Sequence, residues 1–517
     1  MTHASPVNGD ARTGFITVLL RLAARWWFPL ALTVFLITAF LESAAGNGFL
    51  GLGVSASPQD AIDVLCPGPD PCWYLTSGQD LLDQGFVRDE NFWIWNLWPP
   101  GVSVLSAVYI VMARSGMSLT VAAGCITIAS WVIVLTAWKS LLDRYAGRIL
   151  SLVAVSTVAL GQIMRGWYLG NGLLYMESAS TVCLLLALLF VAKATRFGGA
   201  ERSVRARFLL GAAAGAALAA AAYLRTPFEP PGLVLTIVTI IAILLVLAWG
   251  SFAGRTSEWW GSKLSPLVPL IGLVTAFHVL TVPWRIIVSQ RVRAGDRRWS
   301  VVSDLVWKGT WTPTDELVQN GASFLASGTF NTACRVEPVL CRSIYDSEIS
   351  TTSPAGRSVG EFQRLTVQAF LDHPLQWLWI KVEASPRFWF AAPRSVDKFE
   401  LLENGVLLVL LLMVVLLGYR RLGPTLYLVF ISVLIMTLAS IFVSHYEARY
   451  LYPIKSVLPV LAALCVTRLG AATPPKSAEQ KVTREAAPGC QESADDSSPI
   501  APQTDADEPA ETEPSRV

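Results

Sequence analysis

The sequence predicts an all-α polytopic membrane protein with about ten transmembrane helices. Of the 517 residues, 53% are hydrophobic and only 15% are charged, and the mean hydropathy is +0.49. This composition is too apolar for a soluble protein of such length. The apolar residues are also grouped into runs, each near the ~20 residues that a helix needs to cross a bilayer. Basic residues gather in the short connections between these runs, as they do in multi-pass proteins.

Ten apolar runs are long enough to be membrane spans. The first, residues 26–46, follows Arg12, Arg21 and Arg25, and we expect it to remain as a helix because no cleavable signal peptide is evident. A further run, 101–113, is too short to cross a hydrocarbon core of ~30 Å. The remaining spans are predicted at 118–138, 148–164, 178–194, 207–224, 230–250, 264–284, 402–418, 424–444 and 452–469.

The basic connections decide the orientation. If 101–113 does not span, four of them fall on the same side as the basic N-terminus, and this side is the cytoplasmic one. We therefore expect both termini in the cytoplasm and an interfacial helix at Pro99–Ala113 on the outer face. The four connections are Lys139–Arg148, Lys193–Arg207, Arg255–Lys263 and Arg420-Arg421. The outer segments are then 47–117, 165–177, 225–231, 285–401 and 445–451.

The predicted organisation has five parts. The large outer segment is polar and long enough to form a small cap with helices at 360–371 and 375–382. The C-terminal stretch is rich in Pro, Ala, Ser and acidic residues, so we expect it to be disordered. The parts are a cytoplasmic lead (1–25), a membrane module (26–284) that contains the first outer loop (47–117), an exoplasmic cap (285–401), the last membrane helices (402–469) and a cytoplasmic tail (470–517).

Two close pairs of cysteines lie in the outer loops. Cys66 and Cys72 form one pair, and Cys334 and Cys341 form the other. Such pairs suit disulfides in an oxidising compartment. A metal site is the alternative, although neither pair has a CxxC spacing or a neighbouring histidine.

The first outer loop contains the main candidate for catalysis, Asp70, between Pro69 and Pro71. A carboxylate on such a stiff backbone could act as a general base, whereas the alternative is a simple turn residue. Tyr74 follows, and a helix is predicted at Leu75–Gln84. Other aspartates of the loop compete for the role, although two of them suit the polar face of that helix; these aspartates are Asp60, Asp63, Asp80 and Asp83. The tryptophans of the loop suit either interfacial anchoring or contact with sugar rings and prenyl chains; they are Trp73, Trp93, Trp95 and Trp98.

Charged residues also gather at the predicted outer ends of the spans. Arg165 and Glu177 flank one helix pair, and Arg225 ends a helix. An arginine at an outer end runs against the positive-inside bias. Its presence there therefore favours pairing with an anion, such as a lipid phosphate, over simple snorkelling. The last outer loop contains Glu447, Arg449 and Tyr450, where an internal ion pair is the alternative to a functional site.

Several classes of function are disfavoured by the sequence. It has no Walker loop, GxSxG elbow, HExxH or Rossmann glycine pattern, so nucleotide use is not supported. The net charge is +2 and there is no basic domain, which argues against a nucleic-acid partner.

These features together resemble the type C glycosyltransferases, the superfamily that includes protein mannosyltransferases and bacterial aminoarabinose transferases. That family places a catalytic acidic residue in the first outer loop, with a tyrosine, a helix and a Pro-Pro turn after it, as at Asp70, Tyr74 and Pro99-Pro100-Gly101. The acidic pair of the family is often Asp-Glu, whereas Pro71 follows Asp70 here. The other similar motifs are Leu224-Arg225-Thr226-Pro227, Pro283-Trp284-Arg285, His373-Pro374, Phe388-Trp389 and Glu447-Ala448-Arg449-Tyr450 with Pro453.

The resemblance implies inverting transfer of a sugar from a polyprenyl-phosphate carrier to a lipid, glycan or protein acceptor on the outer face. Asp70 would then be the base, while Arg225 and Arg449, with Arg165, would bind the carrier phosphate. Tyr74, Glu447 and Tyr450 would also contact the phosphate or the sugar of the donor. Glu177 would orient the sugar or assist a divalent metal, although no cofactor is required by the sequence. We expect the protein in the inner or plasma membrane of a bacterium, surrounded by membrane lipids. A lipid-linked glycan ligase or polymerase, or a transporter or flippase, are the alternatives.

Overall fold

The described part of the chain consists of helices and the turns between them, and no strand is present in it. The computed structural model describes residues 26–42, 69–88, 91, 94–95, 99–164, 176–195, 203–225, 228–252, 264–293, 371, 374–375, 378, 389–390, 398–443 and 451–470. The chain divides into two units, Met1–Gly470 and Ala471–Val517, and every described residue belongs to the first. Apart from Gly470, the predicted tail therefore lies outside the described residues.

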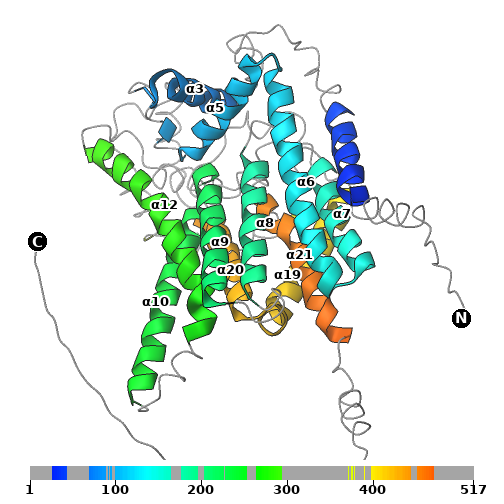
Figure 1. Ribbon diagram of the computed structural model, residues 1–517, viewed down its shortest axis with the longest axis vertical. Coiled ribbons are helices and arrows are strands. Elements are labelled where there is room, and N and C mark those ends of the chain that lie inside the picture. Colours follow the sequence, from blue (N-terminus) through cyan, green and yellow to red (C-terminus); the bar gives the residue numbers. More distant parts are fainter. Residues whose placement is uncertain are drawn as a thin grey trace, which may run out of the picture. The chain divides into compact units, whose positions relative to one another are not determined.

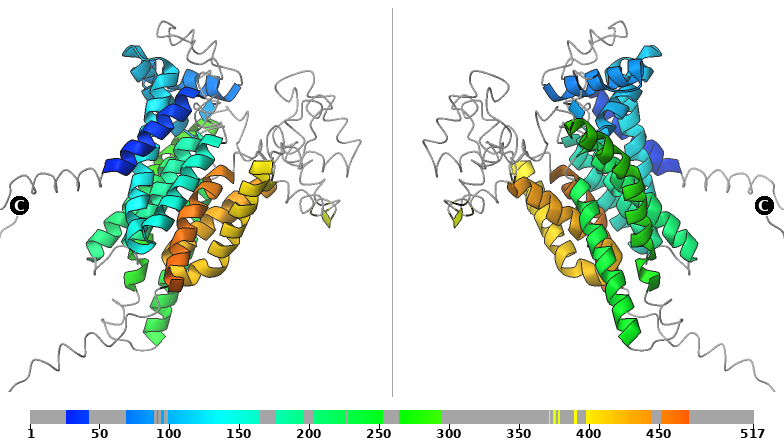
Figure 2. Two further views of the ribbon diagram at one scale, coloured as in Figure 1. Left: turned by 90° about the vertical axis from the view of Figure 1, so that its right-hand side faces the viewer. Right: turned by 90° about the vertical axis from the view of Figure 1, so that its left-hand side faces the viewer.

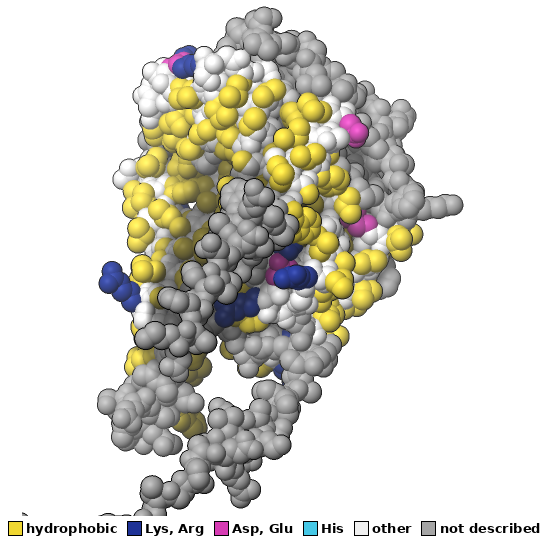
Figure 3. Space-filling view, turned by 45° about the vertical axis from the view of Figure 1, so that its right-hand side comes forward, with side chains coloured by type: hydrophobic (Ala, Val, Ile, Leu, Met, Phe, Trp, Pro, Cys, Tyr) yellow, Lys and Arg dark blue, Asp and Glu magenta, His cyan; other side chains and the backbone are white. Residues whose placement is uncertain are grey.

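All ten predicted apolar runs coincide with helices. The helices are Trp26–Glu42, α3 (Pro69–Gln84), α5 (Gly101–Arg114), α6 (Leu119–Tyr145), α7 (Arg148–Met164), α8 (Glu177–Ala194), α9 (Val204–Leu224), α10 (Glu229–Phe252), α12 (Val268–Arg293, after the 3-10 turn η5, Ser265–Leu267), α19 (Lys398–Leu422), α20 (Pro424–Val443) and α21 (Tyr452–Gly470). Six of them are long and apolar enough to cross a membrane, namely α6, α8, α9, α10, α12 with η5, and α19. These helices indicate an integral multi-pass membrane protein. The hydrophobic side chains that cover much of the described surface in Figure 3 agree with this class.

The helices α9 and α12 approach each other unusually closely. A Cβ added to Gly211 would overlap the carbonyl oxygen of Pro269, and one added to Gly215 would overlap that of Leu273. On the partner helix, Gly272 lies equally close to the carbonyl oxygen of Phe208. Small residues at such an interface let two backbones come into contact, which is a common way for membrane helices to associate. The two helices therefore form a closely packed pair, and they lie side by side in Figure 1.

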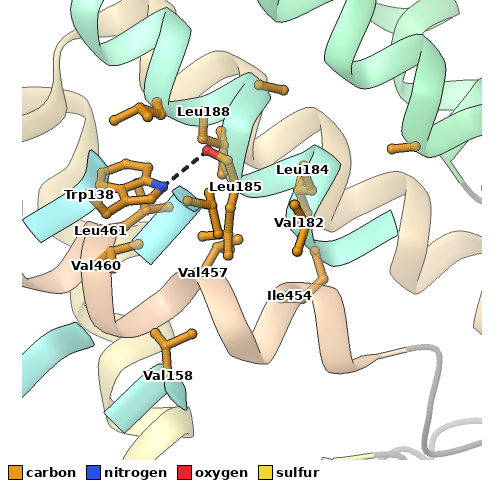
Figure 4. Packing of buried hydrophobic residues seen from close by; sticks show 14 of the residues in the cluster. Trp138, Val158, Val182, Leu184, Leu185, Leu188, Ile454, Val457, Val460 and Leu461 are labelled. Atoms are coloured by element: carbon orange, nitrogen blue, oxygen red, sulfur yellow. Dashed lines mark hydrogen bonds between the residues drawn. The ribbon is translucent and has the colours of Figure 1, made fainter. Parts of the chain in front are cut away.

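The centre of the helix bundle is formed by α8 and α21. Trp138 of α6 is fully buried there, and its indole N–H donates to the carbonyl oxygen of Leu185 at 3.1 Å. Ile454, Val457 and Leu461 follow the same order along α21 as Val182, Leu185 and Leu188 along α8 (Figure 4). The two helices are thus parallel, and their N-termini lie toward the same end of the bundle.

The short helices α3 and α5 pack against each other at one end of the bundle (Figures 1 and 2). Gly78 allows this approach, since a Cβ there would lie 2.8 Å from Ser106 Cβ. A buried chain of hydrogen bonds joins the two helices, in which Trp95 Nε1 donates to Ser103 Oγ at 2.8 Å and Ser103 Oγ donates to Ser77 Oγ at 2.7 Å. With 14 residues, α5 is only about 21 Å long, which is shorter than a hydrocarbon core of ~30 Å.

The predicted start of the first-loop helix was wrong. The first-loop helix was expected at Leu75–Gln84, but α3 begins six residues earlier, at Pro69. Proline is tolerated in the first turn because the N–H groups of this turn have no partner within the helix. Asp70 is therefore in the first turn of a helix and not in an isolated turn, and a carboxylate at this position is favoured by the helix dipole.

Candidate functional site

The N-terminal part of α3 lies against the ends of two core helices. Tyr74 of α3 is 1% exposed and forms a small apolar cluster with Val102 of α5, Met176 before α8 and Leu224 of α9. Met176 and Leu224 are the direct sequence neighbours of the predicted site residues Glu177 and Arg225. The fold therefore brings four segments that are distant in sequence together at one place.

Glu177 and Arg225 form a buried ion pair at this place. The guanidinium Nη2 of Arg225 donates to Oε1 of Glu177, and the two residues are 8% and 4% exposed. Glu177 is the first residue of α8 and Arg225 is the C-cap of α9, so each charge is on the side that the dipole of its own helix favours. Removing one partner of such a pair would leave an uncompensated buried charge, which typically destabilises a protein by about 3–5 kcal/mol.

The chain turns sharply after Arg225, and this turn sets the position of the guanidinium. Arg225 has an extended backbone, while its N–H still donates to the carbonyl oxygen of Ala221 at 2.8 Å. The N–H of Phe228 then donates to the carbonyl oxygen of Arg225, which closes the turn into α10. The Arg-Thr-Pro sequence explains the end of the helix, because a residue before proline is disfavoured in the helical region.

A second ion pair lies close by, between the start of α10 and the C-terminal part of α12. Arg285 Nε is 2.6 Å from Glu229 Oε1. The Tyr223 hydroxyl donates to the carbonyl oxygen of Leu280, which ties α9 to the same part of α12. Polar contacts thus join the start of α10 to the C-terminal parts of α9 and α12. Neither Glu229 nor Tyr223 was among the site residues predicted from the sequence.

The tryptophan of the first loop that the structure describes most fully is packed inside the protein. Trp95 is 7% exposed and lies edge-on to Phe86, with ring centroids 4.8 Å apart, and to Trp284 of α12, at 5.1 Å. Its indole N–H donates to Ser103 Oγ. Trp95 therefore connects the first loop to α12 and does not present a free face to a sugar ring, whereas Trp93 and Trp98 lie outside the described residues.

The competing aspartates of α3 have structural contacts. Asp80 was expected on the polar face of the helix, but it is 3% exposed. Its carboxylate accepts from the backbone N–H of Arg88 at 3.2 Å and from Asn91 Nδ2 at 2.8 Å, and it also pairs with the Arg88 guanidinium. It therefore anchors the turn that follows α3, which a sequence pattern cannot reveal.

Asp83 is exposed, as predicted. Its pKa is lowered chiefly by a hydrogen bond from Gln79, and Arg114 of α5 also lowers it. The carboxylate lies 3.4 Å from Nη2 of Arg114. Asp83 is thus a solvated ion-pair residue, and it offers a matched comparison for Asp70 on the same helix.

Several predicted residues lie wholly or partly outside the described part of the chain. The structure describes the backbone of Asp70 but not its side chain, and a further set lies wholly outside the described residues, namely Arg165, Glu447, Arg449, Tyr450, Cys66, Cys334 and Cys341. Cys72 forms a disulfide bond. Cys125, Cys183 and Cys465 are free thiols. Among the described residues, no three His, Cys, Asp or Glu side chains gather closely enough to bind a metal ion.

One polar cluster was not predicted from the sequence. Lys455 of α21 is 2% exposed, and its ammonium donates to the carbonyl oxygen of Trp389 and to Oδ1 of Asn404 in α19, both at 2.8 Å. A signal was present, since Lys455 is the only charged residue between 451 and 465. An ionisable residue within such an apolar stretch is a functional hypothesis by default.

No family model, curated protein or solved structure matches this chain.

Proposed function

We propose that this protein is a membrane glycosyltransferase that moves a sugar from a polyprenyl-phosphate donor to an acceptor on the outer face of the membrane. The observation that supports this most is the meeting of the α3 N-terminal region with the buried Glu177–Arg225 pair, through the Tyr74 cluster. A carboxylate and a cation close to one membrane surface are the two groups that such a transfer requires. The resemblance to type C glycosyltransferases, which rests on sequence motifs, supports the same reaction.

In the proposed membrane arrangement the six long apolar helices span the membrane together with Trp26–Glu42, α7, α20 and α21, and α5 lies in the outer interface beside α3. Both termini are cytoplasmic, and the first and last outer loops face the same side. The ends of α9, α10 and α12 that carry Arg225, Glu229 and Arg285 are then exoplasmic. The short length of α5 and its packing along α3 support this arrangement.

In the proposed reaction Asp70 accepts the proton of the acceptor hydroxyl or amine as the acceptor atom bonds to the anomeric carbon. The bond between that carbon and the phosphate oxygen breaks, with inversion, and the polyprenyl phosphate leaves with the electron pair. Arg225 stabilises the charge of the leaving phosphate, together with Arg449 and Arg165. Glu177 fixes the position of the Arg225 guanidinium, which has five N–H donors and can therefore contact both a carboxylate and a phosphate.

The test is sugar transfer by the purified full chain in nanodiscs. A polyprenyl-phosphate donor with a radiolabelled sugar is supplied together with a membrane extract as the source of acceptors. We expect Asp70→Asn to lower the rate of label transfer about 10²–10⁴-fold, the usual contribution of a general base. Asp83→Asn, which removes an exposed carboxylate from the same helix, should retain the rate of the parent protein.

Other outcomes identify the alternatives. Full activity of Asp70→Asn would exclude Asp70 as the base. Label that changes leaflet while it stays on the carrier lipid would indicate a flippase. Label found on a growing glycan from a diphosphate-linked donor only would indicate a ligase or polymerase.

A further inference from the structure

The cluster around Lys455 joins three separate segments of the chain. Lys455 is in the first turn of α21, Asn404 is in the second turn of α19, and Trp389 precedes α19. All three are buried, with exposed fractions of 2%, 3% and 8%. Their contacts are therefore made inside the protein and not at its lipid-facing surface.

Hydrogen bonds link the three residues to one another. The Lys455 ammonium donates to the Trp389 carbonyl oxygen and to Asn404 Oδ1, each at 2.8 Å. The Trp389 indole N–H donates to the Asn404 carbonyl oxygen, also at 2.8 Å. The ammonium also lies 5.2 Å from the centre of the Trp389 ring, within the range of a cation–π contact. Each of the three residues thus contacts the other two.

Packing alone does not account for a cation at this position. The residues from 451 to 465 are all buried, and Lys455 is the only charged one among them. Burying an ammonium has a penalty of several kcal/mol, and an apolar residue of similar volume is often as stabilising or more so. A lysine, however, supplies several directed donors at the end of a long side chain, and these can fix segments that apolar contacts would leave free to slide.

The position of Lys455 in the chain indicates which segment it holds in place. It lies five residues after Tyr450, at the end of the Glu447–Tyr450 stretch. We propose that Lys455 is a positioning residue, which anchors the start of α21 to α19 and Trp389 and thereby sets the position of this stretch. This inference rests on the proposed function in one respect only, namely that Glu447–Tyr450 binds the carrier phosphate.

The anchoring itself can be tested without any activity assay. Hydrogen–deuterium exchange of the full chain in nanodiscs is compared for the parent protein, Lys455→Met and Lys455→Arg. We expect Lys455→Met to raise exchange about tenfold in the peptide that contains Trp389 and Asn404, and to leave peptides from α8 unchanged. Lys455→Arg retains a cation and donors, so its exchange should lie between those of the other two.

Two further variants serve as controls. Lys139→Met removes another lysine that makes cation–π contacts, with Trp27 and Phe28, and it should not alter exchange near Trp389. Asn404→Ala removes a single acceptor and should raise exchange at the same place by a smaller factor, which retains the test if Lys455→Met does not fold. The proposal is overturned if Lys455→Met exchanges near Trp389 at the same rate as the parent protein. It is also overturned if Lys455→Arg exchanges there as fast as Lys455→Met.

Sugar transfer then tests the link to the site. Lys455→Met should raise KM for the polyprenyl-phosphate sugar by about tenfold, with a smaller change in kcat, because ground-state binding of the carrier is lost. A lower kcat at unchanged KM would overturn the positioning role. If the parent protein transfers no sugar, the proposed function fails while the exchange data still decide whether the anchor exists.

Discussion

The close contact of α9 and α12 makes a quantitative prediction for Gly215→Ala. A methyl group at this position would overlap the carbonyl oxygen of Leu273, which is backbone and cannot rotate away. The two helices would have to separate by more than an ångström to restore ordinary contact. Overpacking of this kind typically destabilises a protein by about 1–3 kcal/mol. Since Arg225 is the C-cap of α9, the separation would also displace the guanidinium from Glu177.

The assay is reversible unfolding of the full chain in mixed micelles, with Gly405→Ala as the matched control. Gly405 is also a helical glycine, but a Cβ there would meet nothing within 4 Å. Alanine at position 405 should therefore stabilise α19 by about 0.5–1 kcal/mol through its helix propensity. If Gly215→Ala is as stable as the parent protein, or if both alanines have the same effect, the backbone contact is not what joins α9 to α12.

Four further outcomes are expected. Arg225→Met should destabilise the protein by about 3–5 kcal/mol in thermal or denaturant unfolding, and adding Glu177→Gln should restore part of this loss, because the remaining buried charge is then removed; equal stability of the single and double variants would contradict the pairing. A cysteine introduced at Ala113 should react with a membrane-impermeant reagent added outside, whereas reaction only from the cytoplasm would reverse the orientation. The carboxylate of Asp83, whose pKa is lowered in the folded protein, should titrate below the ordinary range of aspartate. Its contribution to stability is present above its unfolded-state pKa and is lost as the pH falls through its folded-state pKa. The difference in stability between the parent protein and Asp83→Asn should therefore shrink on acidification. Deletion of residues 475–517 should leave sugar transfer intact, and complete loss would show that the tail takes part in it.

The helices could be predicted from the sequence because membrane spans need a minimum length of apolar residues. This requirement located every long helix of the described part, and it also identified α5 as too short to span. The start of α3 was predicted wrongly because prolines at 69 and 71 suggest a loop, although the first turn of a helix accommodates them. Local sequence does not distinguish these two possibilities.

The partners of the site residues could not be predicted in the same way. Glu177 and Arg225 were each singled out for their place at the end of an apolar run, but they are 48 residues apart, and their pairing is a result of how α8 and α9 pack. Asp80 and Lys455 show the same limit. Asp80 lies on a helix whose pattern looks ordinary, whereas Lys455 is marked in the sequence as a lone charge in an apolar stretch. Only the tertiary contacts show that Asp80 anchors a turn and that Lys455 joins three segments.

The position of the carrier phosphate is tested most directly by a cryo-EM structure of the full chain in a nanodisc with bound polyprenyl phosphate. We expect phosphate density within hydrogen-bonding distance of the Arg225 guanidinium, at the end of the bundle where α3 begins, with the Asp70 carboxylate facing the same aqueous space. Density at the opposite ends of the membrane helices, or too far from Asp70 for one sugar head group to reach both residues, would contradict the proposed function.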